Sequence, residues 1–372
     1  MKLFFYINSI HEGGGAERVI SVLSQQMAKR GCDVTMITSF KDTWEYTLDE
    51  KVRRISLESE KLKTNKLKRN LSRIRKLRSI CKREKPDVLI SFMFEPNIRA
   101  LIATMGLKTK TIISVRNDPE KENGRGVARF LAKTLYRLAD GYVFQTEQAK
   151  KWFAPKIQKK SVVILNPVSD SFYYVNGAPC VKKSVVSVGR LEEVKNFNLL
   201  IKAFALIADE YPEYQLEIYG DGTLRNMLKE LINELDLSNR IILKGQCSDI
   251  SSQIKDASLF VLSSNVEGLP NALMEAMALG LPVISTDFAG GGARTLIEDG
   301  VNGIIVPIGN EKALAEAMRK ILSDREYALN LGSKAKVKSS EFKPDNIADK
   351  WYTYIKYVAA RIDENMQKQF RV

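Results

Sequence analysis

The sequence predicts an α/β protein with two domains, each built around a parallel β-sheet. Three observations support this fold class. The chain has 372 residues, more than the ~250–300 at which a single hydrophobic core stops growing. Short apolar runs alternate with amphipathic stretches, as in βαβ units. The alternation starts again in the second half of the chain, after a segment rich in turn-forming residues.

The first half begins with an apolar run at residues 3–8, which we interpret as a buried strand. This run is too short for the core of a signal peptide, and no run approaches the ~20 apolar residues that span a bilayer. We therefore expect a cytoplasmic protein. Val19, Ile20, Leu23 and Met27 lie on one face of a helix expected over 17–29. Further strands are expected at 33–38, 87–92, 111–115, 141–145 and 162–165.

The second half repeats the pattern. Its strands are expected at 184–188, 215–219, 240–243, 258–262, 282–285 and 303–306, and its helices at 197–211, 224–235, 271–279 and 312–322. Between the halves, Asn166-Pro167 and Asn176-Gly177 are typical of turns. We accordingly expect a first domain over residues 1–170, a second over 171–343, and over 344–372 a helix that packs back toward the first.

Composition narrows the function classes. Lysine and arginine number 58 against 44 acidic residues, and the resulting net charge of +14 suggests an anionic partner. The single histidine excludes a multi-histidine metal centre. The four cysteines are far apart and form no C-x-x-C pair, so we expect reduced structural thiols instead of disulfides or a zinc site.

The most informative group of residues follows the strand expected at 258–262. Glu267 lies on the loop at the carboxyl end of this strand, the side on which open α/β sheets bind ligands. The backbone N–H groups around Gly268, Leu269 and Asn271 form an anion site at a helix start. Glu275, further along the helix, can accept hydrogen bonds from a cis-diol such as ribose. Alone, such a pair of glutamates is typical of an ordinary helix start, but other motifs accompany it.

Basic residues follow an earlier strand of the same domain. Gly189 and Arg190 end the strand expected at 184–188, and Lys195 comes five residues after the arginine. Both cations can reach a diphosphate, the arginine through its planar fork and the lysine as a point charge.

Two glycine-containing turns also follow strands. Gly220, Asp221 and Gly222 form a turn at which a ligand or the facing domain can approach the backbone closely, although such a turn alone is a weak signal. Thr223 is expected to be the N-cap of the helix that follows. In the first domain, a second turn between strand and helix is of the kind that cradles phosphate, with a simple flexible turn as the alternative. This second turn contains Gly13, Gly14 and Gly15.

In this order along the chain, the motifs resemble those of glycosyltransferase family 4. Its members are retaining enzymes with the GT-B fold, in which two Rossmann-like domains with parallel sheets face a central cleft. The resemblance is greatest to bacterial enzymes that build capsule, exopolysaccharide or lipid-linked oligosaccharide. It is carried by Gly13-Gly14-Gly15-Ala16-Glu17, Gly189-Arg190-Leu191, Lys195-Asn196, Gly220-Asp221-Gly222 and the run from Glu267 to Glu275.

The resemblance implies roles for the matching residues. Arg190 and Lys195 would bind the donor diphosphate and stabilise the departing nucleotide. Glu267 would contact hydroxyls of the donor sugar, and Glu275 the ribose. The glycine loop of the first, acceptor-binding domain would approach the donor phosphate and the acceptor. Front-side displacement, often proposed for such enzymes, requires no protein base, so positioning and positive charge would supply the catalysis.

One departure from the family pattern concerns the segment after the strand expected at 111–115. Many members have a histidine there, close to the donor sugar, whereas this chain has Arg116 and, two residues later, Asp118. Either residue is a candidate for a sugar or acceptor contact. No Asp-x-Asp pair, which holds Mg²⁺ or Mn²⁺ in transferases of the other major fold, occurs in the sequence. We expect neither a metal nor another cofactor.

A basic segment runs from Lys61 to Lys85 and contains twelve lysines and arginines and one acid. We expect a helix whose apolar stripe contains Leu67, Leu71, Ile74, Leu77 and Ile80. Its charged face is interpreted either as an ordinary solvated surface or as a docking surface for an anionic membrane. The residues expected on this face are Lys66, Lys68, Arg69, Arg73, Lys76 and Arg83. Nucleic acid is not expected as a partner, because the aromatic residues of single-strand binders are missing here.

The sequence therefore predicts a transferase that moves a hexosyl or N-acetylhexosaminyl group from a nucleotide sugar, expected to be UDP-linked, to a glycan on a lipid diphosphate. We expect it at the inner face of the cell membrane as a peripheral protein. The alternatives are another GT-B enzyme, such as a sugar-nucleotide epimerase, and a non-catalytic protein that binds sugar nucleotides or anionic surfaces.

Overall fold

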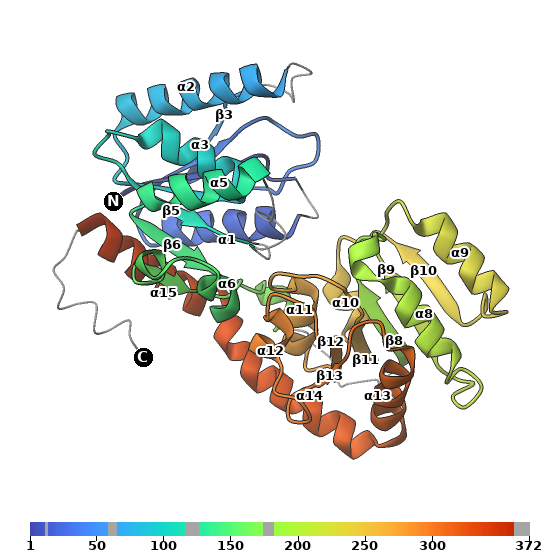
Figure 1. Cartoon of the computed structure of the whole chain (residues 1–372). Coiled ribbons are helices and arrows are strands. Elements are labelled where there is room, and N and C mark those ends of the chain that lie inside the picture. The colour runs from blue at the N-terminus through green and yellow to red at the C-terminus, as the bar shows by residue number, and fades with distance from the viewer. Residues whose placement is uncertain (12–13, 59–64, 117–118, 120–125, 174–181, 361–372) are drawn as a thin grey trace. The chain divides into compact units, whose positions relative to one another are not determined.

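The computed structural model describes residues 1–11, 14–58, 65–116, 119, 126–173 and 182–360. The chain forms two compact units (Figure 1). The first consists of Met1–Pro167 together with the chain from Pro344 onward, and the second of Val168–Lys343. None of the helices in the described part of the chain combines the length and the apolar character needed to cross a bilayer.

The first unit is built on a seven-stranded sheet in the order β3-β2-β1-β4-β5-β6-β7, with every neighbouring pair parallel. The strands are β1 Lys2–Ile7, β2 Asp33–Thr38, β3 Val52–Ser56, β4 Val88–Phe92, β5 Lys110–Ser114, β6 Gly141–Phe144 and β7 Ser161–Val163. The sequence analysis did not predict β3. It is an edge strand in which Arg53 and Arg54 interrupt the apolar residues, so its pattern does not show that one side pairs with β2.

Helices cover both faces of this sheet, with α2, α3 and α5 on one face and α1 and α15 on the other (Figure 1). The helices are α1 Gly15–Lys29, α2 Lys66–Glu84, α3 Phe94–Thr104, α5 Gly126–Leu135, α6 Glu147–Lys151, α7 Pro155–Gln158 and α15 Pro344–Ala360. The fully buried Trp351 on α15 stacks on Phe92 with the ring centroids 5.8 Å apart. The Tyr354 hydroxyl accepts a hydrogen bond from the Tyr142 amide at 2.8 Å and donates one to the Lys160 carbonyl at 2.5 Å.

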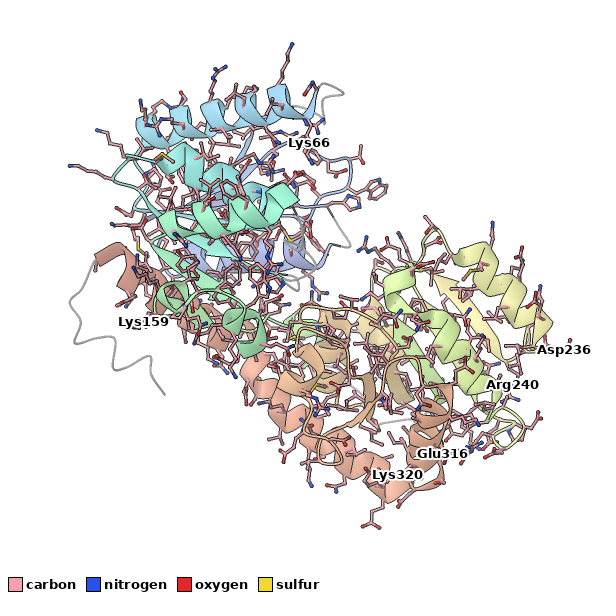
Figure 2. All side chains as sticks on the ribbon, in the orientation of Figure 1. Lys66, Lys159, Asp236, Arg240, Glu316 and Lys320 are labelled. Atoms are coloured by element: carbon pink, nitrogen blue, oxygen red, sulfur yellow. The ribbon has the colours of Figure 1, made fainter. Side chains whose placement is uncertain are left out.

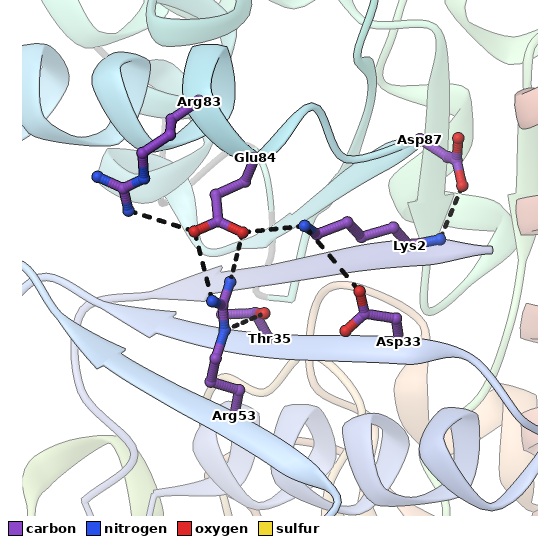
Figure 3. Close-up of polar contacts among 7 residues, drawn as sticks. All are labelled: Lys2, Asp33, Thr35, Arg53, Arg83, Glu84 and Asp87. Atoms are coloured by element: carbon purple, nitrogen blue, oxygen red, sulfur yellow. Dashed lines mark hydrogen bonds and ion pairs between the residues drawn. The ribbon is translucent and has the colours of Figure 1, made fainter.

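The basic helix α2 is anchored at both ends. At its start, the Asn65 side chain caps the helix by accepting a hydrogen bond from the Leu67 amide at 2.9 Å. At its end, Glu84 accepts hydrogen bonds from Lys2 at 2.9 Å and from Arg53 at 3.0 and 3.3 Å (Figure 3). These bonds, first that from Arg53 and then that from Lys2, lower the pKa of the Glu84 carboxyl to about 2. The charge network therefore joins the end of α2 to β1 and β3.

The apolar stripe expected on α2 is wrong in its first half. Leu77 and Ile80 are buried, but the side chains of Leu67 and Leu71 are 77% and 45% exposed. Conversely Arg73, expected on the solvated face, is buried and pairs with the buried carboxylate of Glu58. The buried apolar residues of the helix therefore lie in its second half, whereas its first half contacts the unit through polar residues such as Arg73 and Asn70.

The second unit contains a six-stranded parallel sheet in the order β10-β9-β8-β11-β12-β13. Its strands are β8 Lys182–Val188, β9 Gln215–Tyr219, β10 Ile241–Gly245, β11 Ala257–Leu262, β12 Val283–Thr286 and β13 Ile304–Val306. The helices are α8 Phe197–Ala205, α9 Arg225–Glu234, α10 Ile250–Ile254, α11 Asn271–Leu279, α12 Gly292–Leu296, α13 Glu311–Ser323 and α14 Arg325–Ser339. Every strand expected for this half of the chain is present, with no end shifted by more than two residues.

The described cysteines Cys32, Cys81 and Cys247 are free thiols, and the first two are buried. Burial raises the pKa of the Cys81 thiol to about 12, which makes this group unreactive at neutral pH. Cys180 lies outside the described residues.

Candidate active site

The strand order of the second unit brings two loops together at one edge of the sheet. From β8 the chain continues to β9 and β10 on one side and then returns to β11 on the other side of β8. Open α/β sheets bind ligands at the carboxyl ends of the strands, at the point where the order reverses in this way. Arg190 and Lys195 follow β8 and Glu267 follows β11, so all three leave the sheet at the switch point.

Lys195 and Glu267 form an ion pair there. The ammonium group donates to Glu267 Oε1, and Ser264 Oγ donates to the same oxygen at 2.9 Å. The Lys195 and Glu267 side chains are 18% and 16% exposed, so the pair is mostly shielded from water. An ammonium group has three N–H donors, and the pair thus holds Lys195 in place while donors remain for a ligand.

Polar residues fasten the two loops to each other, and of these the sequence analysis named Asn196 but missed Ser263 and Asn265. Asn196 Nδ2 donates to Asn265 Oδ1 at 2.9 Å, and the Asn265 amide donates to the Val194 carbonyl at 2.8 Å. Ser263 Oγ donates to the Lys195 carbonyl at 2.9 Å. The signal for these residues was the polar run that directly follows the apolar strand β11, at the edge where ligands bind.

Arg190 is at the same edge but points elsewhere. Its side chain is 70% exposed, and Nη1 lies 2.9 Å from Glu192 Oε1. Because an exposed ion pair contributes only ~0–1 kcal/mol, the guanidinium can leave Glu192 for a stronger anionic ligand at little cost.

The glycines of the two neighbouring turns are required by the fold. A Cβ atom on Gly220, whose φ is +135°, would lie 1.9 Å from the Gly189 carbonyl oxygen. A Cβ atom on Gly222 would lie 2.5 Å from the Leu191 carbonyl oxygen. Asp221 is in contact with the same strand end, since its carbonyl accepts a hydrogen bond from the Leu191 amide at 3.0 Å. These glycines allow the loops after β8 and β9 of the same unit to touch, a contact that the sequence analysis did not predict.

A neighbouring prediction is wrong. Thr223 is not the N-cap of the next helix, because α9 begins at Arg225 and Leu224 occupies the cap position. The turn after β9 therefore continues one residue further than expected before the helix starts.

Helix α11 begins next to Glu267, as predicted. Asn271 is its first residue and Pro270, with an extended φ of −77°, is its N-cap. Gly268 is partly exposed and Leu269 is buried, while a Cβ atom on Gly292 would lie 2.1 Å from the Gly268 carbonyl oxygen. Glu275 is 4% exposed on α11.

The glycine loop of the first unit follows β1. Gly14 is the N-cap of α1 and Gly15 is its first residue, whereas Gly13 lies outside the described residues. The carboxylate of Glu17 folds over this helix start, so that a Cβ atom on Gly14 would lie 2.2 Å from Glu17 Oε2. A phosphate group at this helix N-terminus would meet a carboxylate, and Glu17 would have to turn away first.

Arg116 lies two residues after the end of β5 in the first unit, and it is 5% exposed. Its guanidinium carbon is 4.5 Å from the centroid of the Phe92 ring. Asp118, the other candidate for this position, lies outside the described residues. Across the described ranges, no three His, Cys, Asp or Glu side chains are close enough to share a metal ion.

Comparisons with known proteins agree with this geometry. The family model for glycosyl transferases group 1 matches residues 175–338, and the model for glycosyltransferase family 4 matches residues 13–172. An α-1,4-N-acetyl-D-galactosaminyltransferase of Campylobacter jejuni is 29% identical over 95% of this chain and 98% of its own length. Its name gives the acceptor as a GalNAc-containing glycan on PP-undecaprenol. An uncharacterised glycosyltransferase of Haemophilus influenzae is 27% identical over 94% of this chain and 98% of its own.

Solved structures show the same fold. Anabaena Alr3699/HepE in complex with UDP superposes with a TM-score of 0.80 at 19% identity, covering 96% of this chain and 100% of that one. Two parallel-sheet units, two matching family models and relatives of equal length lead to one conclusion. The chain is a glycosyltransferase of family 4 with the GT-B fold.

Proposed function

We propose that this transferase moves a hexosyl or N-acetylhexosaminyl group from a UDP-sugar to a lipid-linked glycan in the biosynthesis of a surface polysaccharide, with retention of the anomeric configuration. The observation that carries the proposal is the Lys195–Glu267 pair at the switch point between β8 and β11. Two Campylobacter jejuni relatives whose names give diphospho-undecaprenol glycans as acceptors support the acceptor class. The solved neighbour in complex with UDP supports the donor class.

In the proposed reaction, the bond from the anomeric carbon to the β-phosphate oxygen breaks and the acceptor oxygen bonds to the same face of that carbon. The acceptor proton passes to the departing phosphate oxygen. Lys195 and Arg190 neutralise the charge that develops on the diphosphate, and the amides at the start of α11 add hydrogen bonds. Glu267 orients Lys195 and accepts a hydrogen bond from a hydroxyl of the donor sugar. Glu275 accepts hydrogen bonds from the ribose hydroxyls.

The two units have different roles in this proposal. The second unit, which holds Gly189, Arg190, Lys195 and Glu267, binds the donor. The first unit, with Gly14 and Gly15 after β1, binds the acceptor. No metal takes part, because the two cations and the helix N-terminus supply the positive charge that a divalent ion supplies in other transferases.

A membrane surface is the proposed location, and the structure sharpens the choice of residues on α2. Lys68, Arg75 and Lys82 are exposed and recur every seven residues, with the exposed Leu71 on the same face. Lys66, labelled in Figure 2, is exposed at the start of the helix and pairs with Glu95 at 2.8 Å. Each basic residue near an anionic leaflet contributes ~1 kcal/mol, and an apolar side chain between them can insert at the interface.

The membrane proposal is tested by flotation with liposomes of phosphatidylglycerol. The K68E/R75E/K82E variant is expected to lose binding, and the wild type to lose it at high salt. The matched control is K229E/K312E/K334E, which changes the same charge at exposed lysines of the second unit. Equal binding by both triple variants would show that α2 is an ordinary solvated helix.

The reaction is tested with the purified full chain, a set of UDP-sugars and a short-chain polyprenyl-diphosphate glycan, with and without EDTA. Mass spectrometry is expected to show one added sugar, and NMR is expected to show an α-linkage in the product of an α-linked donor. The rate of transfer is expected to be the same with and without EDTA. Turnover that requires magnesium or manganese would refute the metal-free site. Conversion of the UDP-sugar to its epimer without an acceptor would identify the alternative GT-B activity.

A further inference from the structure

Arg116 is a buried charge for which the proposed reaction has not yet given a role. Nη1 of its guanidinium donates to Ser114 Oγ at 3.3 Å. Nε and Nη2 are buried and have no hydrogen-bond partner among the residues that the structure describes. Burial alone lowers the pKa of the guanidinium to about 9, since no charged neighbour contributes to the shift. The group is therefore still a cation at neutral pH.

The two unpaired nitrogens form one edge of the guanidinium. Their N–H bonds point the same way in the plane of the group, as needed to bind a carboxylate or phosphate through two parallel hydrogen bonds. Both donors of this bidentate edge are buried and unpaired among the described residues. The edge has the donor geometry of an oxyanion receptor.

Other buried arginines of the same unit are treated differently by the fold. Arg73 makes two bonds to the Glu58 carboxylate, at 2.9 and 2.5 Å. Arg99 donates to the side-chain oxygens of Asn8 and Asn70 at 2.5 and 3.2 Å. Among the described residues, Arg116 makes its polar contacts only with the Ser114 hydroxyl and the Phe92 ring. A buried cation costs several kcal/mol unless it is paired, so this position is expected to have a partner that the chain does not supply.

A buried acceptor lies at the same edge of the sheet. Ser114 on β5 pairs with Val143 on β6, so Arg116 and Gln145, each two residues further, leave the sheet side by side. Gln145 is 4% exposed, and its Oε1 has no hydrogen-bond partner within the described ranges, while its Nε2 is held by Asn166 at 2.8 Å. An open donor edge beside an open acceptor fits an oxyanion that has a hydroxyl next to it.

We propose that Arg116 binds an oxyanion of the substrate through its Nε–Nη2 edge, with Gln145 Oε1 accepting a hydrogen bond from a neighbouring hydroxyl. The ligand class is an oxygen-rich anion, either a phosphoryl group of the lipid diphosphate or a carboxylate on a sugar. The inference rests on the proposed transfer function only in assigning this anion to a substrate. The binding itself stands on the geometry of the first unit.

The experiment uses the full chain saturated with UDP, so that the proposed donor site is filled. Inorganic pyrophosphate and methyl glucuronide are titrated separately by calorimetry, with methyl glucoside as the neutral control. The wild type is expected to bind at least one of the two anions, and the probe that binds identifies the source of the oxyanion. R116M is expected to bind that probe at least tenfold more weakly, and R116K to fall between, because lysine keeps the charge but lacks the fork.

A stability measurement separates binding from a structural role. Without ligand, R116M is expected to melt at the same temperature as the wild type or up to ~4 °C higher, because the unpaired buried charge is gone. R99K is the matched control, because Arg99 is a buried arginine with partners inside the unit. It is expected to lower the melting temperature and to leave anion binding unchanged. If neither anion binds the UDP-saturated wild type, or if R116M binds as tightly, the proposal is wrong. An absence of sugar transfer would count against the proposed function and not against this site.

Discussion

The Lys195–Glu267 pair allows the structural and chemical parts of the site to be separated in one set of variants. In K195M, Glu267 keeps only the hydrogen bond from Ser264 and remains largely shielded, at 16% exposure. The loss of one charge-assisted hydrogen bond at such a position is worth ~1.5–3 kcal/mol. The second unit of K195M is therefore expected to unfold ~3–10 °C below that of the wild type.

Transfer activity is expected to fall by more than stability explains. Removal of one cationic donor from a leaving group that develops negative charge costs about 10²–10³ in kcat, or ~2.7–4 kcal/mol. E267Q keeps the shape of the side chain and its bond to Ser264. The double variant K195M/E267Q removes both charges together, so it is expected to recover most of the lost stability and none of the lost activity.

The assays are calorimetric melting and steady-state transfer from the donor identified above, on all four members of the double-mutant cycle. The coupling between the two positions is expected to be ~1–3 kcal/mol in stability. The control is K183M, because Lys183 pairs with Glu213 at 3.0 Å in the same unit with side chains 59% and 44% exposed. Its removal is expected to change stability by less than ~0.5 kcal/mol and to leave turnover unchanged.

Two results would refute this reasoning. A K195M turnover within about threefold of the wild type would mean that Lys195 does not face the leaving group. Recovery of activity in K195M/E267Q would mean that the lysine serves only to neutralise Glu267.

Three further variants test the fold around the site. E84Q is expected to lower the stability of the first unit by ~1–2 kcal/mol at pH 7, after allowance for screening at the surface. Because the pKa of the folded carboxyl is lowered to about 2 from 4.5, the difference from the wild type is full above pH 4.5 and disappears as the pH falls toward 2, which urea titrations along this range would show. G220A is expected to cost more than ~3 kcal/mol, because its Cβ would meet the Gly189 carbonyl. At Gly309, whose φ is +70°, an added Cβ would meet no atom of the described residues within 4 Å beyond its chain neighbours. G309A is therefore expected to cost only ~1 kcal/mol, and equal melting temperatures of G220A and G309A would contradict the contact at Gly220. Y354F removes the hydroxyl that bonds both the Tyr142 amide and the Lys160 carbonyl and leaves these two groups with their mutual bond of 3.3 Å. It is expected to lose ~1–3 kcal/mol, and a melting temperature equal to that of the wild type would show that α15 does not depend on this hydroxyl.

Much of the fold could be predicted because it depends on local pattern. Buried parallel strands are continuous apolar runs, and the alternation of strand and helix restarts at the second unit, so the fold class and twelve of the thirteen strands follow from the sequence. The strand that was missed is β3, which lies at the edge of the sheet. Its two arginines interrupt the apolar run by which a strand is predicted. Their acceptors are Glu84 and Glu45, which lie far away or in a loop, and no short-range pattern reveals such a pairing.

The helix α2 shows where periodicity is insufficient. Its leucines and arginines predicted one buried and one solvated face, but which residues are buried depends on what the rest of the unit offers. Glu58, from the loop after β3, supplies a carboxylate that buries Arg73, and no element covers Leu67 and Leu71 among the described residues. Which residues of a helix are buried therefore depends on the elements that pack against it and not on the periodicity of the helix alone.

The sequence by itself determined which residue types stand at the carboxyl ends of the strands, and from them a donor site with Arg190, Lys195 and Glu267. Only the tertiary structure decided that Lys195 and Glu267, 72 positions apart, form one ion pair and that Arg190 is exposed and pairs with Glu192. It also decided that Arg116 is buried with an open edge. Strand order and the packing of loops bring distant residues into contact, and the free energy of a charge depends on those contacts, which a sequence pattern does not contain.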